Sequence, residues 1–111
     1  MEQQVKTPQL RQGDVLLEEF DGPLPEGVDI PLENGRMVLA HGEATGHVHS
    51  IAPMRGARFI ETKEGRRFLS LPSPALLEHQ EHTALAVPAG KVHEVVRQRE
   101  YSPQAVRNVN D

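Results

Sequence analysis

The chain has 111 residues, a formal net charge of −4 and no cysteine, which suits one domain with a modest core. The lack of cysteine excludes disulfides, thiolate metal sites and cysteine catalysis. The acidic balance argues against a general nucleic-acid or anionic-membrane binder, because both need a dominant basic face. No apolar run reaches the about 18 to 20 residues of a membrane-spanning helix, and the N-terminus lacks the apolar centre of a signal peptide, so we expect a cytoplasmic protein.

Glycine and proline divide the sequence into short runs rich in Val, Leu, Ile and Phe. Apolar runs of this length between turn residues are typical of β-strands. We expect strands at 14–20, 36–41, 47–51, 57–62, 66–71, 82–87 and 91–101. Residues 1–10 are expected to form a flexible arm before a single β domain at 11–111.

Three further segments need separate interpretation. Residues 21–35 are rich in proline and glycine and predict a long surface loop with a short edge strand at 28–30. Residues 73–82 could begin a helix, but we favour a strand at 75–79 that turns directly into the next strand. Ser102 followed by Pro103 predicts a short C-terminal helix.

These elements predict an all-β fold: a small antiparallel β-sandwich or partly closed barrel with a short C-terminal helix. A jelly-roll or cupin-like arrangement is one possible form of it. About seven to nine strands are expected. With no Trp, one Tyr and three Phe, the core is lean, so the domain would gain from covering its strand edges as a homo-oligomer.

The most informative residues are six histidines: His41, His47, His49, His79, His82 and His93. His47 and His49 lie two residues apart, which places both imidazoles on one face of a strand. His79 and His82 share a face on a helix, or lie opposite each other across a two-residue turn. Since imidazole is a common ligand of transition metals, we expect these four residues to bind a divalent ion such as Zn, Ni, Mn or Fe.

Other interpretations of the histidines stay open. They could form a structural or pH-sensitive polar cluster, or be unrelated surface residues. A carboxylate close to the imidazoles would favour metal binding over these alternatives. Glu78 is a possible additional ligand, and Glu43, Glu61 and Glu81 are further candidates.

Arg97, Arg99 and Tyr101 would share one face of the last strand. Two guanidinium groups beside a tyrosine could bind a phosphate or carboxylate. The alternative, which we favour, is that these arginines pair with acids of the N-terminal half, within the chain or across an interface. That half, residues 1–50, carries nine acids and three basic residues.

Two resemblances follow from these motifs. His47 and His49, with Pro88, Gly90 and His93, resemble the two motifs of the cupin β-barrels. That resemblance implies a metal site that includes His93, although the glutamate that cupins place soon after the first motif has no counterpart at 50–56.

The second resemblance spans most of the chain. The order of GDVLL, GHVH, HQEH, PAG and QREY is similar to a family of small uncharacterised proteins of prokaryotes and their phages. It implies that His47, His49, His79 and His82 belong together. It also implies a possible phage or host protein partner, and location in the virion if the protein is structural.

Two classes of function remain. One is a metal-binding β domain, with hydrolytic or other metal-assisted activity possible; the other is a non-enzymatic, phage-related structural, decoration or assembly protein that acts as a homo-oligomer. The sequence leaves open whether the protein is an enzyme. P-loop, dinucleotide-binding, hydrolase-elbow and zincin motifs are absent from it.

Overall fold

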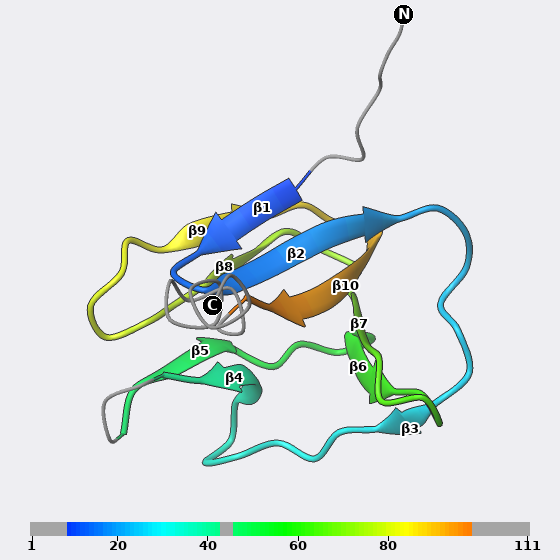
Figure 1. Ribbon diagram of the computed structural model, residues 1–111, viewed down its shortest axis with the longest axis horizontal. Helices are drawn as coiled ribbons and strands as arrows, with labels where there is room; N and C mark the ends of the chain where they lie inside the picture. The colour runs from blue at the N-terminus through cyan, green and yellow to red at the C-terminus, as the bar shows by residue number, and fades with distance from the viewer. Residues whose placement is uncertain (1–8, 43–45, 99–111) are drawn as a thin grey trace, which may run out of the picture.

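The computed structural model describes residues 9–42 and 46–98, which form ten strands and no helix (Figure 1). Every strand pair is antiparallel. The strands are β1 (Gln9–Gln12), β2 (Val15–Phe20), β3 (Val28–Asp29), β4 (Met37–His41), β5 (Val48–Ile51), β6 (Arg58–Glu61), β7 (Arg67–Ser70), β8 (Ala75–Leu77), β9 (Leu85–Val87) and β10 (Val92–Arg97).

The main sheet has six strands in the order β1-β2-β10-β7-β6-β3. At its centre β10 pairs with both β2 and β7, so that Val95 lies opposite Leu17 and Arg67. Buried and half-buried residues alternate along β10, as expected for a strand with one face on the core. The short strand β3 forms one edge of this sheet and β1 forms the other.

Two smaller ribbons, β4-β5 and β8-β9, complete the fold. They are joined by a bridge in which the backbones of Ser50 and Glu78 exchange two hydrogen bonds of 2.9 and 2.8 Å. β9 in turn contacts β1, so the strands follow one another around the core from β3 through the main sheet to β4. The barrel is not closed, and the architecture is therefore a partly closed antiparallel barrel.

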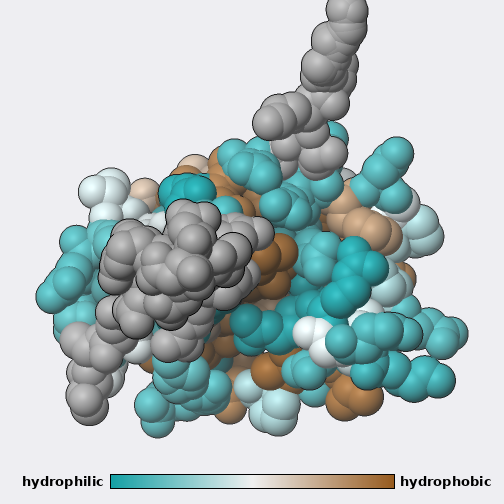
Figure 2. Space-filling view, viewed as in Figure 1, coloured by the Kyte–Doolittle hydropathy of each residue, from teal (hydrophilic) through white to brown (hydrophobic). Residues whose placement is uncertain are grey.

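The hydrophobic core lies between the main sheet and the two ribbons. Its fully buried members come from every side, among them Leu17 of β2, Leu39 of β4, Ile51 of β5 and Leu77 of β8. In Figure 2 the surface of this face is mostly polar, and apolar residues show near its middle and along its lower margin. Within the described residues, no helix is long and apolar enough to cross a bilayer.

The expected all-β fold is confirmed, including the edge strand at β3 and the strand, rather than helix, at β8. β1 was not expected, because its sequence QLRQ has only one apolar residue. The turn between β8 and β9 was predicted too short: the strands end and begin at Leu77 and Leu85, so residues 78–84 form a loop. The predicted C-terminal helix and most of the predicted N-terminal arm lie outside the described residues.

Candidate functional site

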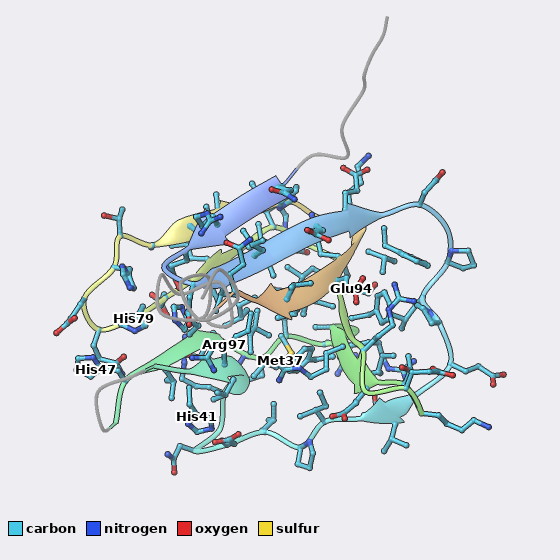
Figure 3. All side chains as sticks on the ribbon, viewed as in Figure 1. Met37, His41, His47, His79, Glu94 and Arg97 are labelled. Carbon is cyan, nitrogen blue, oxygen red and sulfur yellow. The ribbon has the colours of Figure 1, made fainter. Side chains whose placement is uncertain are left out.

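The four histidines of the two sequence motifs line one cavity of about 390 Å³ at one end of the barrel. Three places in the chain supply its walls: the β1–β2 turn, the two strands β4 and β5 where they meet their connection, and the β8–β9 loop. The lining residues are Gly13, Asp14, Gly42, His47, His49, His79, Glu81 and His82. Figure 3 shows His47 and His79 near each other at the left end of the molecule, with Glu94 well to the right of them.

His49 is the most buried residue of the cavity, and a hydrogen bond from the core side holds its ring in place. It is only 1% exposed, and its Nδ1 lies 2.8 Å from Oε1 of the buried Gln12. The amide nitrogen of Gln12 already donates to the carbonyl oxygens of Leu77 and Thr83, at 2.8 and 3.0 Å. The amide oxygen is therefore an acceptor, Nδ1 of His49 carries the proton, and Nε2 presents a lone pair.

The lone pair of His49 is close to a carboxylate that an arginine already neutralises. Nε2 lies 3.7 Å from Oδ1 of Asp14, too far for a hydrogen bond. Asp14 is paired with Arg97, at 3.1 Å. Burial above all, and then the neighbouring His79, lower the pKa of His49 from 6.5 to about 4, against the opposing effect of Asp14. His49 is accordingly a neutral imidazole at neutral pH.

His79 is held in the opposite tautomer by its own loop. Its Nδ1 accepts hydrogen bonds from the backbone N–H groups of Glu81 and His82, at 2.9 and 3.3 Å. An accepting Nδ1 has no proton, so in the neutral ring the proton is on Nε2. Burial, followed by the charges of His82 and His47, lowers the pKa of His79. Both bonds lie within the β8–β9 loop and join His79 to the residues two and three positions after it.

The imidazole rings are packed closely together. His79 is central among them, with ring centres 5.4 Å from His47, 4.4 Å from His49 and 4.5 Å from His82. The rings of His49 and His82 are stacked at 5.8 Å. Two imidazoles bound to one tetrahedral Zn²⁺ have ring centres about 5 Å apart, given metal–nitrogen distances of about 2.0 to 2.1 Å. The observed separations lie on both sides of that value.

Two glycines leave the space that the rings occupy. A Cβ atom on Gly13 would lie 2.7 Å from Nε2 of His82, and one on Gly42 would lie 2.9 Å from Cβ of His47. Gly13 also has a φ of +60°, which favours glycine independently of space. Gly42 has no positive φ, so its lack of a side chain serves the packing of the histidines.

The donor atoms do not yet surround a common point. Across 9–42 and 46–98, no three histidine or carboxylate side chains are placed so that they could hold a metal ion together as they stand. Both carboxylates of the cavity are slightly too far from their nearest imidazole for a hydrogen bond: Asp14 is 3.7 Å from Nε2 of His49, and Oε2 of Glu81 is 3.9 Å from Nδ1 of His47. Binding of an ion would therefore need rotation of side chains, for which His47, at 23% side-chain exposure, has more freedom than His49.

The other candidate residues lie elsewhere. His93 is buried in the main sheet, between Glu19 and Leu69, and does not line the cavity. Glu78 is beside the cluster but is bound to Arg36 at 2.6 Å. Since the sequence motif that resembles cupins requires His93 next to His47 and His49, the structure does not reproduce that ligand set.

The predicted arginine pair is only partly described. Arg97 pairs with Asp14, which confirms for this residue the expectation that an arginine near the C-terminus binds an acid of the N-terminal half. Arg99, Tyr101 and the candidate Glu43 lie outside the described residues. His41 is on the surface beside Glu33, at 3.1 Å, and does not line the cavity.

Sequence reasoning missed Gln12, Gly13 and Asp14, which complete the cavity from the β1–β2 turn. The sequence RQGDV reads as an ordinary turn before a strand. The glycine and aspartate of this turn were a weak signal. Nothing local indicated that Gln12, just before the turn, bonds to His49 and Leu77, which are far away in the sequence.

The fold and the site together define a class: a small, partly closed antiparallel barrel with a histidine-lined cavity at one end. A family model described as "Domain of unknown function (DUF8820)" matches residues 11–98, and the chain belongs to this family. That match includes all ten strands except the first two residues of β1, and all the residues that line the cavity. No curated protein and no solved structure showed a significant match.

Proposed function

We propose that this cavity binds a divalent transition-metal ion, with His49 as a ligand and His47 among the other imidazoles that complete the site. The observation that carries the proposal is the fixed ring of His49, whose Nδ1–H is bonded to Gln12 while its Nε2 lone pair is on the cavity side. Metal-binding histidines commonly have this arrangement, in which a partner of the second nitrogen sets the tautomer and the direction of the ring.

The composition of the cavity supports a cation rather than an apolar ligand. Its walls carry four imidazoles and two carboxylates but no apolar side chain. Neutral imidazoles are the form that binds transition metals, and without cysteine the chain must use nitrogen and oxygen ligands. The carboxylate of Glu81 would add negative charge beside the ion, and Asp14, which is paired with Arg97, offers further oxygen atoms at the cavity wall.

Such a site could support metal-assisted chemistry. An ion held by three protein ligands keeps an open position, at which a bound water is acidified and a substrate oxygen is polarised. Glu81 has a side chain that is 71% exposed and lies at the cavity, so it is the group best placed to accept a proton there. Hydrolysis is the reaction class that this arrangement would suit.

Isothermal titration of untagged, metal-free protein with Zn²⁺ tests the proposal. The wild type should bind close to one ion per chain, and a variant with His47→Ala and His49→Ala together should lose this binding. His41→Ala is the matched control, because His41 is an exposed histidine outside the cavity and its loss should leave binding unchanged. Unchanged binding in the double variant, or no binding by the wild type, would contradict the proposal.

A second candidate function is that of a non-enzymatic structural or assembly protein acting as a homo-oligomer, such as a phage-related decoration protein. The observation that favours it is the open sheet edge at β3, where Val28 is 75% exposed and Leu32, shortly after the strand, is 50% exposed. An exposed apolar edge strand is a surface on which a second chain can pair.

A further inference from the structure

The hydrogen bonds of the cavity give its two most central histidines different chemical roles. His49 donates from Nδ1 to Gln12 and therefore has a free lone pair on Nε2. His79 accepts at Nδ1 from two backbone N–H groups and therefore has a proton on Nε2. With ring centres only 4.4 Å apart, a ligand atom would meet an acceptor from one ring and a donor from the other.

The N–H group of His79 is directed toward the cavity wall formed by Gly42. Its Nε2 lies 3.1 Å from the position that a Cβ atom of Gly42 would occupy, so a larger residue there would crowd it. His79 lines the cavity, and within residues 9–42 and 46–98 no protein group accepts a hydrogen bond from its Nε2. As far as the described part of the chain is concerned, the donor is available to a ligand in the cavity.

We propose that His79 is not a metal ligand but a hydrogen-bond donor, and that its Nε2–H binds an oxygen of a small oxyanion held at the open position of the metal. This inference rests on the proposed function, since the ion is what brings an oxyanion into the cavity. His47, His49 and His82 then remain as the imidazole ligands. The site takes a carboxylate or a phosphate group as its ligand class.

Ligation by His79 would break its present hydrogen bonds. A lone pair on Nε2 would require the proton on Nδ1, where it would face the N–H groups of Glu81 and His82. Three donors would then meet with no acceptor among them, and the β8–β9 loop would lose the contacts that hold its turn. As a donor, His79 keeps both bonds.

The charges of the cavity agree with an oxyanion once an ion is present. Asp14 is neutralised by Arg97 at 3.1 Å, and Glu81 is largely exposed to solvent. A divalent ion therefore leaves the cavity with a net positive charge, which attracts an anion. Without the ion, the charge of Glu81 opposes an anion in the cavity, so metal and oxyanion should bind in that order.

The protonated nitrogen can be observed directly by long-range ¹H–¹⁵N NMR of the histidine rings, with and without Zn²⁺. We expect His79 to carry its proton on Nε2 in both states, while Nε2 of His49 changes from free to metal-bound. Loss of the Nε2 proton of His79 on addition of Zn²⁺, or a proton on Nδ1 in the metal-free protein, would overturn the inference.

Titration of the Zn²⁺-loaded protein with inorganic phosphate, and separately with acetate, tests the ligand. In His79→Asn, the side-chain carbonyl oxygen can take the place of Nδ1 and accept the hydrogen bonds from the backbone N–H groups of Glu81 and His82. The variant therefore preserves the loop but lacks the Nε2–H donor. It should weaken phosphate or acetate binding about tenfold and change Zn²⁺ affinity by less than about threefold. His79→Gln, whose amide N–H reaches further, should restore part of the loss, and His41→Asn is the matched control.

The outcomes separate the two proposals. A large loss of Zn²⁺ affinity in His79→Asn, comparable to that of a His49 variant, would make His79 a ligand and overturn this inference alone. Binding of neither phosphate nor acetate by the Zn²⁺-loaded wild type, or binding that His79→Asn leaves unchanged, would overturn it as well. Failure of the wild type to bind Zn²⁺ would contradict the proposed function, and the inference would fall with it.

Discussion

Replacing Gln12 with leucine should both destabilise the protein and weaken metal binding. Gln12 is only 3% exposed, and its amide makes hydrogen bonds to His49 Nδ1, to the carbonyl of Leu77 and to the carbonyl of Thr83. Leucine has a similar size but no polar atom, so it leaves two buried groups, His49 Nδ1–H and the Leu77 carbonyl, without their partner.

The expected loss can be worked from those two groups. A buried polar group without a partner costs about 1 to 3 kcal/mol, so two of them cost at least about 2 kcal/mol of unfolding free energy. Loss of the partner that orients a metal-binding histidine typically lowers metal affinity by about 10- to 100-fold. The two effects have one cause and should appear together.

Urea unfolding of metal-free protein and Zn²⁺ titration by calorimetry measure the two effects. Gln9→Leu is the matched control, because Gln9 lies on the same strand but is exposed, and its amide donates a solvent-exposed hydrogen bond to Glu18. The control should change stability by less than about 0.5 kcal/mol. The reasoning is refuted if Gln12→Leu is as stable as Gln9→Leu, or if it binds Zn²⁺ as tightly as the wild type.

Three further predictions follow from other parts of the structure. Gly42→Ala should weaken Zn²⁺ binding, because the new Cβ would lie 2.9 Å from Cβ of His47 and 3.1 Å from Nε2 of His79; calorimetry with affinity equal to the wild type would contradict this. Burial lowers the pKa of His93, so the stability that its neutral ring contributes is complete above about pH 6.5 and is lost as the pH falls toward the folded-state pKa. In urea unfolding with a chelator present, His93→Gln should therefore lose less stability than the wild type between about pH 7 and about pH 5, and an equal loss would show that His93 is not responsible. Val28→Lys should reduce self-association at the β3 edge, since a charge on an edge strand opposes pairing; sedimentation velocity showing a wild-type monomer at all concentrations, or an oligomer that the substitution leaves intact, would exclude that edge as the contact.

The strands were predictable because each apolar run is short and is bounded by a turn with its own local signal. Gly65 and Gly90, for example, have φ values of +86° and +80°, which few other residues adopt, and each lies in a connection that the sequence marks. β1 was not predicted because its residues are mostly polar, and it is held at the edge of the sheet by pairing with β2. That pairing is a local hairpin, with Gln12 opposite Val15 across the two-residue turn Gly13-Asp14, so the turn was a signal that the sequence reasoning did not use.

The grouping of the histidines was predictable only in part. The spacing of His47 and His49 on a strand indicated one shared face, and the structure places both at the cavity. The role of Gln12 depended on packing between β1 and the β8–β9 loop, and the tautomer of His79 depended on the path of that loop. Spacing alone therefore suggested four equivalent ligands, whereas the hydrogen bonds distinguish them.

Elemental analysis of the untagged protein, purified without added metal or chelator, tests the central claim most directly. The account predicts close to one equivalent of a transition metal per chain in the wild type, and a large loss in the variant with His47→Ala and His49→Ala. A wild-type protein that contains no transition metal, and acquires none when Zn²⁺ is supplied and the excess removed, would contradict it.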